Sequence, residues 1–310
     1  MVEFVICLCF ILISIFCSSK KSSNMYSMNT TKFFKGIMAL LVIISHVFEK
    51  GYLLGPLAVS IFFCISGYGL KYKYGKGGKI TLANLVSLYI PFVIVNCINI
   101  FFRKLSSPLE IFLSFFTCSV TPYTWYIFII IIIYILFSLI YKSKYVHKDC
   151  IMYIIIILMI PILYLLGFES WWFVSLIGFN IGVFAFNIKN VEIKSNYNYL
   201  MPLFCLINSV IFIYLNDLNN GYIFGICLIL NSTFASLAYV AYAKKYECKN
   251  IILEKIGDYS LTMYLFHPIV LNYIKIDTEL ITFFITVIIT YALSCTYFKL
   301  KQILTCYLCK

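Results

Sequence analysis

A histidine lies near the end of the first long apolar run of this sequence, in LLVIISHVFEKG at residues 40–51. His46 follows Ser45, and Glu49 comes three residues after the histidine. Side chains three apart share one face of a helix, so Glu49 could hold one ring nitrogen of His46 while the other nitrogen faces a substrate. This arrangement suits a general base. The same spacing fits a histidine that only hydrogen-bonds a neighbouring helix, and the residues leave both interpretations open.

The two other histidines have different surroundings. His267 directly precedes Pro268 in YLFHP, and a proline removes a backbone donor, which leaves a carbonyl available to a polar partner. This pattern favours a structural role for His267. His147 lies in the polar stretch KSKYVHK, and we interpret it as a solvated loop residue.

A glycine-rich cationic stretch, LKYKYGKGGK, follows the second apolar run. Its lysines are Lys71, Lys73, Lys76 and Lys79. A flexible cationic loop of this kind can bind phosphate groups. Lysines also collect on the cytoplasmic side of membrane proteins for reasons of insertion alone, so the stretch by itself does not establish a phosphate site.

The composition indicates a membrane protein. The chain has 310 residues, of which 63% are hydrophobic and 12% charged, whereas soluble domains contain about 45–50% apolar residues. The net charge of +12 comes without a basic stripe interleaved with aromatic residues in a soluble domain, so nucleic-acid binding is not predicted. The thirteen cysteines are scattered, apart from a C-x-x-C at Cys306 and Cys309, and we predict neither a disulfide framework nor a metal site.

An apolar run of about 20 residues crosses the hydrocarbon as a helix. The runs of this chain are too long and too continuous for the alternating strands of a membrane β-barrel. The sequence therefore predicts an all-α, polytopic transmembrane bundle of about ten core helices. The predicted spans are residues 33–48, 52–70, 82–102, 124–141, 151–167, 171–187, 199–215, 222–243, 259–275 and 280–298.

The lysines orient these spans, because cytoplasmic loops of membrane proteins retain positive charge. If the core begins in the cytoplasm, all but four of the 24 basic residues fall on that side. The four outside are Lys50, Arg103, Lys104 and Lys275. His46 then lies near the outer end of its helix, in a multi-pass protein of the plasma membrane. The acidic residues expected outside, where they could bind hydroxyl groups, are Glu49, Glu169, Asp217, Asp277 and Glu279.

We divide the chain into residues 1–32, a membrane domain at 33–298 and a short basic cytoplasmic tail at 299–310. Within the first part, the apolar stretch 4–17 is short for a span. Its positive charges follow the apolar residues, which is unlike a secretory signal. It is either one extra short N-terminal helix or a segment before a later translation start at Met25 or Met28, and we favour the later start.

Five stretches carry most of the sequence pattern: FFKGIMALLVIISHV, GPLAVSIFFCISGYGL, TWYIFIIIIIYILF, SWWFVSLIGFNIGVF and LEKIGDYSLTMYLFHPIVL. The most specific pieces are the first-helix histidine, the FF-x-x-SG motif with Ser66, and the YL-x-H motif with Tyr264 and His267. Trp125 begins the apolar part of the third stretch. In order and spacing, over residues 33–298, these stretches resemble the integral-membrane acyltransferase 3 family.

The resemblance implies ten core helices with a cytoplasmic start. It also implies an enzyme that transfers acyl groups, commonly acetyl from acetyl-CoA, to hydroxyls of extracytoplasmic carbohydrates. Among the residues, it implies that His46 is catalytic and that Lys35 replaces the usual arginine eleven positions before it, in donor binding. An ammonium keeps the charge of that arginine but loses its planar, two-pronged hydrogen bonding.

Two further features of the family are missing. The stretch NLVSLYIP offers only Asn84, Ser87 and Tyr89 where an arginine pair is often found. Ile130 or Ile131 stands at a position that is often acidic. The chain is therefore either a divergent member in which nearby lysines replace the arginines, or one that has lost activity.

We interpret the chain as a membrane O-acyltransferase with acetyl-CoA, or another acyl-CoA, as co-substrate and no permanently bound cofactor. The expected acceptor is a surface polysaccharide, a lipid-linked glycan or peptidoglycan. His46, assisted by Glu49, is the expected base, and Lys35 with the four lysines of the glycine-rich stretch would bind the donor. One alternative is a transporter or flippase for a polar lipid or sugar, although the paired broken helices of that class are not visible. The other is an inactive scaffold of a polysaccharide assembly system, which the missing arginines favour.

Overall fold

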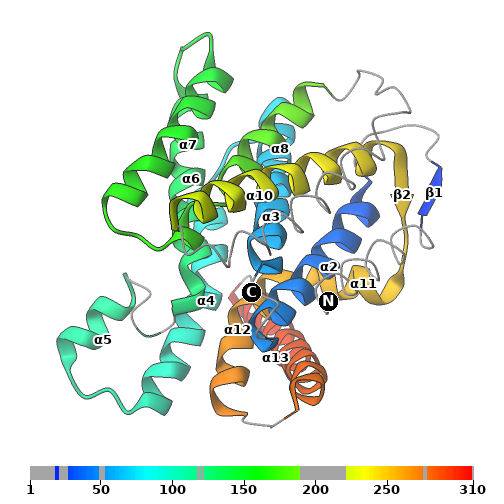
Figure 1. The fold of residues 1–310 in the computed structure, drawn as a ribbon. Helices are drawn as coiled ribbons and strands as arrows, with labels where there is room; N and C mark the ends of the chain where they lie inside the picture. The colour runs from blue at the N-terminus through cyan, green and yellow to red at the C-terminus, as the bar shows by residue number, and fades with distance from the viewer. Residues whose placement is uncertain are drawn as a thin grey trace.

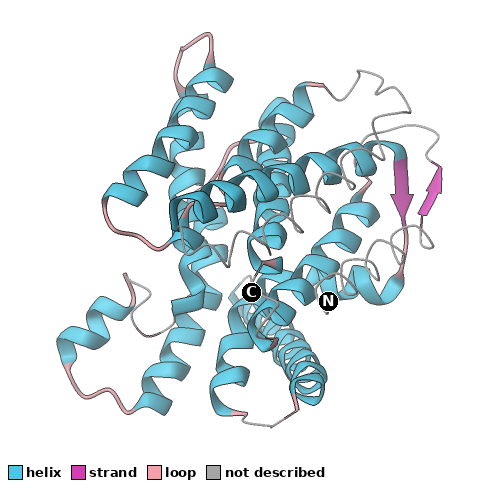
Figure 2. Ribbon diagram, viewed as in Figure 1, coloured by secondary structure: helices cyan, strands magenta, loops and turns pink. Residues whose placement is uncertain are grey.

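The computed structural model describes residues 18–20, 27–48, 53–116, 120, 122–188, 221–274 and 278–308. Most of these residues lie in helices that pack into one bundle (Figure 1). Figure 2 shows one short pair of strands at the edge of that bundle. Eight segments of the described chain are long and apolar enough to cross a membrane. The predicted all-α, polytopic membrane bundle is confirmed.

The described helices range from two turns to more than eight. They are α2 (Met28–Val47), α3 (Leu54–Gly75), α4 (Leu82–Arg103), α5 (Pro108–Ser114), α6 (Trp125–Lys142), α7 (Lys148–Leu165), α8 (Ile177–Asn187), α10 (Gly221–Lys245), α11 (Ile251–Asp258), α12 (Ser260–Tyr273) and α13 (Glu279–Leu308). Short 3-10 turns at Pro122–Thr124 and Ser170–Trp172 lead into α6 and α8. Strands β1 (Ser18–Lys20) and β2 (Tyr246–Cys248) pair antiparallel. The sequence does not predict this pair, because three residues such as SSK carry no strand signal.

Eight of the ten predicted spans have a counterpart among the candidate spans of the structure. The first begins at Met28 rather than at residue 33, because Ser27 caps α2: its hydroxyl accepts a hydrogen bond from the backbone N–H of Thr30 at 3.1 Å. The predicted span 199–215 and the apolar stretch 4–17 lie outside the described residues.

The predicted span 259–275 is shorter in the structure. The chain bends at Tyr259, between α11 and α12, and α12 has 14 residues. At 1.5 Å per residue it is about 21 Å long, less than the roughly 30 Å of the hydrocarbon core. Most of its side chains are buried, with Met263 and Leu265 fully so. A helix that is buried around its circumference packs inside a bundle, so α12 is an internal element.

Small residues bring α3 and α8 into close contact. A Cβ atom added at Gly178 would lie 2.2 Å from the carbonyl oxygen of Ser60, and one at Gly182 would lie 2.0 Å from that of Cys64. From the other side, a Cβ at Gly67 would lie 2.3 Å from the carbonyl oxygen of Phe179. Small residues spaced by four allow this backbone approach in membrane bundles. Gly67 of the FF-x-x-SG motif therefore serves the packing of α3 on α8.

A second close contact joins α2 to α11. A Cβ atom at Gly257 would lie 1.8 Å from the carbonyl oxygen of Lys32, and one at Gly36 would lie 2.1 Å from that of Leu253. The Lys32 ammonium is also 2.9 Å from a carboxylate oxygen of Asp258. The start of α2 is thus fixed against the end of α11.

Contacts between helix ends gather lysines on one side of the bundle, which we call the cationic end. The Lys71 ammonium of α3 pairs with the Asp149 carboxylate of α7. The Lys73 ammonium donates to Oδ1 of Asn84, on the first turn of α4, at 2.9 Å. Lys148, at the start of α7, donates to the carbonyl of Tyr141, near the end of α6, at 3.0 Å. Segments that the lysine pattern assigns to one side of the membrane therefore meet.

Aromatic rings collect where the same helices reach the other side, which we call the aromatic end. The rings of Phe102 and Tyr273, at the ends of α4 and α12, have centroids 4.7 Å apart. Those of Trp125, which begins α6, and Trp172, which precedes α8, lie 6.0 Å apart. Aromatic side chains favour the boundary between hydrocarbon and water. The bundle therefore has two chemically distinct ends.

Candidate functional site

His46 lies in the last turn of α2, at the aromatic end. Its side chain is exposed, whereas Ile43, Ile44 and Ser45 before it are buried. Its ring centroid lies 4.5 Å from that of Tyr123 and 5.1 Å from that of His267, and the two imidazole planes are 26° apart. Glu49, predicted to orient this ring, lies outside the described residues. The structure thus joins His46 to a second histidine more than two hundred residues later.

His267 is fully buried in α12 and held by its own helix. Its Nδ1 lies 2.6 Å from the carbonyl oxygen of Tyr264. In a regular helix that carbonyl would accept from the N–H four residues later, but residue 268 is a proline and has none. The imidazole supplies the missing donor. This is the structural role that the sequence favours for His267.

The same bond determines which nitrogen of His267 carries the proton. A carbonyl only accepts hydrogen bonds, so Nδ1 must donate, and in the neutral ring Nε2 is then an acceptor. Nε2 is buried and has no hydrogen-bond partner among the described residues. A buried polar atom without a partner is uncommon in proteins. The structural role therefore accounts for one side of this ring and leaves the other side unexplained.

Tyr264 connects this cluster to the turn before α6. Its hydroxyl donates to the carbonyl oxygen of Tyr123 at 2.5 Å, which holds the Pro122–Thr124 turn and places the Tyr123 ring against His46. Sequence reasoning missed Tyr123. The available signal was its place in TPYTW, two residues before the motif residue Trp125, because helix starts often position the residues just before them.

The remaining motif residues support this cluster from α3 and α6. The Tyr126 ring lies 4.9 Å from Phe63 and 5.5 Å from Tyr264, so aromatic contacts run from α3 through α6 to α12. Ser66 is half-buried, and its hydroxyl contacts the hydroxyl groups of Tyr126 and Tyr134. Trp125 packs on Trp172. The contacts of Ser66 and Trp125 are with the protein itself.

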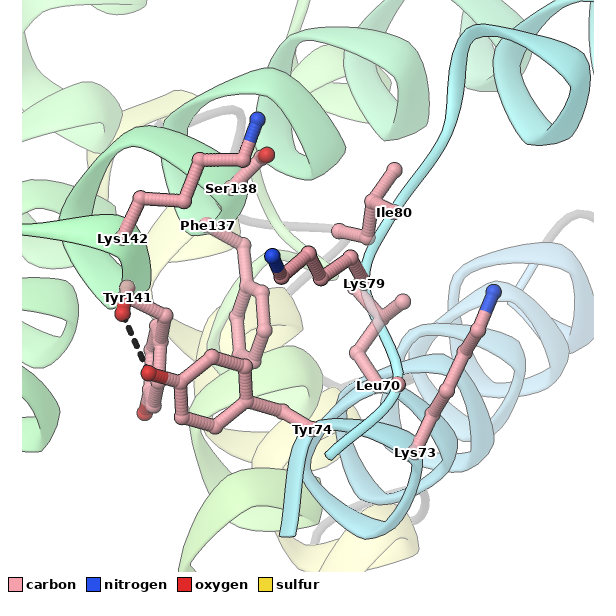
Figure 3. A pocket seen from close by; sticks show the side chains of 10 residues that line it. Leu70, Lys73, Tyr74, Lys79, Ile80, Phe137, Ser138, Tyr141 and Lys142 are labelled. Atoms are coloured by element: carbon pink, nitrogen blue, oxygen red, sulfur yellow. Dashed lines mark hydrogen bonds between the residues drawn. The ribbon is translucent and has the colours of Figure 1, made fainter. Parts of the chain in front are cut away.

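At the cationic end, a pocket opens between α3, α6 and the turn after α3. Figure 3 shows the side chain of Lys79 extending toward Phe137, with Lys73 on the other side of the turn. Tyr74 donates a hydrogen bond to the carbonyl of Tyr141 at the left of this view. The pocket holds about 20 Å³, which suits a water-sized group. A larger anion would therefore bind over its mouth.

The four lysines predicted to bind the donor have different surroundings. Lys71 is ion-paired with Asp149, which also accepts from the Asn187 amide at 2.8 Å. Lys73 donates to Asn84, and the Lys76 ammonium lies 4.6 Å from the centre of the Tyr72 ring. These three lysines are held by the protein.

Two cations at the pocket have no such partner. Lys79 and Lys142 both line the pocket, and neither forms an ion pair or a hydrogen bond with a described residue. Lys142, at the end of α6, is absent from the sequence-based set of donor-binding residues. Its spacing gave no signal, because Lys142 is far in sequence from the glycine-rich stretch that it joins.

Lys35 lies apart from this pocket. It is half-buried on α2, and the charges that act on it are those of Asp258 and Lys32, at the contact of α2 with α11. It is not among the residues that line the pocket. The donor-binding role that the resemblance implies for Lys35 stays a prediction.

The two sites lie on opposite sides of the bundle. At the start of α3, a Cβ atom at Gly55 would lie 3.0 Å from the hydroxyl of Ser45, the neighbour of His46. From Gly55 to Lys73 the helix rises about 27 Å at 1.5 Å per residue. The hydrocarbon core of a membrane is about 30 Å thick. The histidine cluster and the cationic pocket therefore lie near opposite membrane surfaces.

Comparison with known proteins identifies one family. The model of an acyltransferase domain, that of acyltransferase family 3, matches residues 31–299, which is most of the chain. No curated protein and no solved structure gives a significant match.

Proposed function

This chain belongs to the acyltransferase 3 family, and we propose that it moves an acyl group, acetyl in the simplest case, from cytoplasmic acyl-CoA to a hydroxyl of an extracytoplasmic glycan. A multi-pass acyltransferase can serve a donor and an acceptor that lie on opposite sides of a membrane. In this proposal the cationic end faces the cytoplasm of a plasma-membrane protein and the aromatic end faces outside.

The observation that carries the proposal is the environment of His46. Its imidazole is exposed at the aromatic end, in contact with the rings of Tyr123 and His267. An exposed ring can meet a substrate, and the two neighbouring rings limit how it can turn. A general base needs both access to the proton that it removes and a defined orientation.

The proposed reaction transfers the acyl group from the sulfur of CoA to the hydroxyl oxygen of the acceptor. His46 takes the proton of the acceptor hydroxyl as the oxygen attacks the thioester carbonyl. The tetrahedral intermediate collapses with breakage of the C–S bond, and the proton on His46 passes to the leaving thiolate. The products are an O-acylated glycan and free CoA, so His46 returns to its neutral form without a cofactor.

The cationic pocket suits the donor side of this reaction. Lys79 and Lys142 have no anionic partner among the described residues, and they line the pocket together with Tyr74 and Phe137. The phosphates of CoA would meet the two ammonium groups at the mouth of the pocket. Lys73, next to Asn84 at the start of α4, puts a cation near the position where the family often has arginine.

The test is a chemical analysis of surface glycans from cells with and without the gene. We expect mass spectrometry to find an alkali-labile acyl group that disappears with the gene and returns with the wild-type protein. A return of the group with His46→Gln, at matched protein amounts, would contradict the role of His46. A smaller amount of glycan at the surface without the gene, with no change in its acyl groups, would favour a transporter or an assembly scaffold.

A further inference from the structure

Nε2 of His267 is one of the buried polar atoms that lack a hydrogen-bond partner among the described residues. The bond from Nδ1 to the Tyr264 carbonyl makes Nε2 an acceptor. That acceptor is buried without a partner among the described residues. An unpaired buried acceptor reduces stability, and an aliphatic side chain in its place would avoid this loss. The atom therefore calls for a partner that can approach it.

His46 is the polar group placed to be that partner. The ring centres of His46 and His267 are 5.1 Å apart, and their planes differ by 26°. Two imidazoles joined by an N–H···N bond have centres about 5 Å apart, because the nitrogens are about 3 Å apart and each lies about 1 Å from its ring centre. His267 is fixed by its bond to Tyr264, whereas His46 is exposed. A rotation of the His46 side chain would bring a ring nitrogen onto Nε2.

We propose that His267 is a positioning residue for His46: its Nε2 accepts a hydrogen bond from one ring nitrogen of His46, and the other nitrogen of His46 is thereby left as the proton acceptor. The hydrogen bonds then form a series that runs from the Tyr264 carbonyl through His267 to His46. It rests on the proposed role of His46 as the base, and it assigns to His267 the orienting task that the sequence gives to Glu49.

The series also explains how His46 could hold a proton. When His46 becomes an imidazolium, its hydrogen bond to the neutral Nε2 gains strength from the charge. His267 stays neutral, because a second positive charge beside the first would be unfavourable. The ring centre of Tyr123 lies 4.5 Å from that of His46, and the ring centre of Tyr264 lies 5.8 Å from that of His267.

Two substitutions of His267 separate this role from a purely structural one. In His267→Asn the amide nitrogen takes the place of Nδ1, so the bond to the Tyr264 carbonyl survives and the acceptor at Nε2 is lost. In His267→Gln the longer side chain keeps an acceptor near the position of Nε2 and loses the donor at Nδ1. A structural role requires the donor at Nδ1, which asparagine retains. The positioning role requires the acceptor at Nε2, which glutamine retains.

The first measurement needs no substrate. The full-length protein in membranes is treated with diethyl pyrocarbonate, which acylates the free nitrogen of an imidazole, and the modification of His46 is followed by mass spectrometry. The chain has three histidines, and the exposed His147 is the internal reference. We expect the rate at His46, relative to His147, to fall several-fold in His267→Asn and to change little in His267→Gln.

The second measurement is acyl transfer at matched protein amounts. Loss of the partner that orients a metal-bound histidine typically lowers activity roughly 10- to 100-fold. By analogy we expect a loss of about that size in kcat for His267→Asn, with most activity retained in His267→Gln. The reverse order, or equal effects of both variants on the His46 modification, would overturn the proposal. So would slower modification of His46 in Glu49→Gln with no change in His267→Asn.

The two measurements also separate this proposal from the one on which it rests. If His46→Gln retains acyl transfer while the modification of His46 still depends on Nε2 of His267, the hydrogen bond stands and the proposed base is wrong. If His46→Gln abolishes transfer and the rate of His46 modification is the same in both His267 variants as in the wild type, His46 is the base and the positioning role is wrong.

Discussion

The Lys71–Asp149 contact at one end of the bundle and the His46–His267 contact at the other satisfy their polar groups in different ways. At the cationic end, Lys71 and Asp149 neutralise each other and tie α3 to α7. At the aromatic end, His46 and His267 lie ring against ring, and Nε2 of His267 has no partner among the described residues. Paired groups hold helices together, whereas unused hydrogen-bonding capacity marks a place where a proton or a ligand can be received.

The cationic end shows the same contrast within itself. Lys71, Lys73 and Lys76 are occupied by an acid, an amide and an aromatic ring. Lys79 and Lys142 line the pocket without such partners. A lysine-rich loop is therefore not one binding site: of the four lysines that the loop sequence suggests, Lys79 alone lines the pocket without a described partner, and Lys142 joins it from α6.

The largest expected effect is at His46. A positioned general base contributes roughly 10²–10⁴-fold, so His46→Gln should lower acyl transfer by at least about a hundredfold, because glutamine keeps a polar side chain but takes no proton near neutral pH. Transfer to the glycan is measured at matched protein amounts. His147→Gln, in an exposed loop position, is the control and should behave as the wild type. Activity in both variants would remove His46 from the reaction.

The sequence predicted the frame of this site better than its interior. The lengths of the hydrophobic runs located all eight candidate spans of the described residues, because the thickness of the membrane determines how long a spanning helix must be. The span predicted at 259–275 corresponds to α12, Ser260–Tyr273, and composition did not reveal that this helix is buried inside the bundle.

The pairing of His46 with His267 was beyond sequence reasoning. Each histidine was recognised, one by its spacing to Glu49 and the other by Pro268. Their meeting depends on how α2 and α12 pack, and no local pattern encodes a contact across more than two hundred residues. For Tyr123, its place two residues before Trp125 was a local signal, but its hydrogen bond with Tyr264 is a tertiary contact that the sequence does not show.

The second prediction concerns the two groups of lysines. Lys79→Ala with Lys142→Ala should raise the KM for acyl-CoA roughly tenfold, which corresponds to about 1.4 kcal/mol, and should leave kcat nearly unchanged. Lys71→Ala is the matched control: it leaves Asp149 without its cation, so it should lower thermal stability in detergent more than it raises KM. Equal effects of the two changes on KM would show that the ion pair of Lys71 does not keep it from binding the donor as Lys79 and Lys142 do.

The smallest expected effect is at Tyr264. Tyr264→Phe removes the hydroxyl that holds the Tyr123 carbonyl, and a hydrogen bond contributes a net of about 1 kcal/mol. We expect kcat to fall about fivefold, because the Tyr123 ring would be placed less firmly against His46. Tyr145→Phe, at an exposed position of the loop before α7, serves as the control. A loss that is equal in both variants would show that the Tyr123 turn plays no part.

The most direct test of the central claim uses the membrane itself as the barrier. Radiolabelled acetyl-CoA, which does not cross membranes, is added to sealed vesicles of either orientation, prepared from cells that contain the protein and its glycan. We predict that label enters the glycan in inside-out vesicles, where the cationic end faces the added donor, and not in right-side-out vesicles or with His46→Gln. Equal labelling in vesicles of both orientations, or labelling only in right-side-out vesicles, would contradict transfer from the cationic end to the aromatic end.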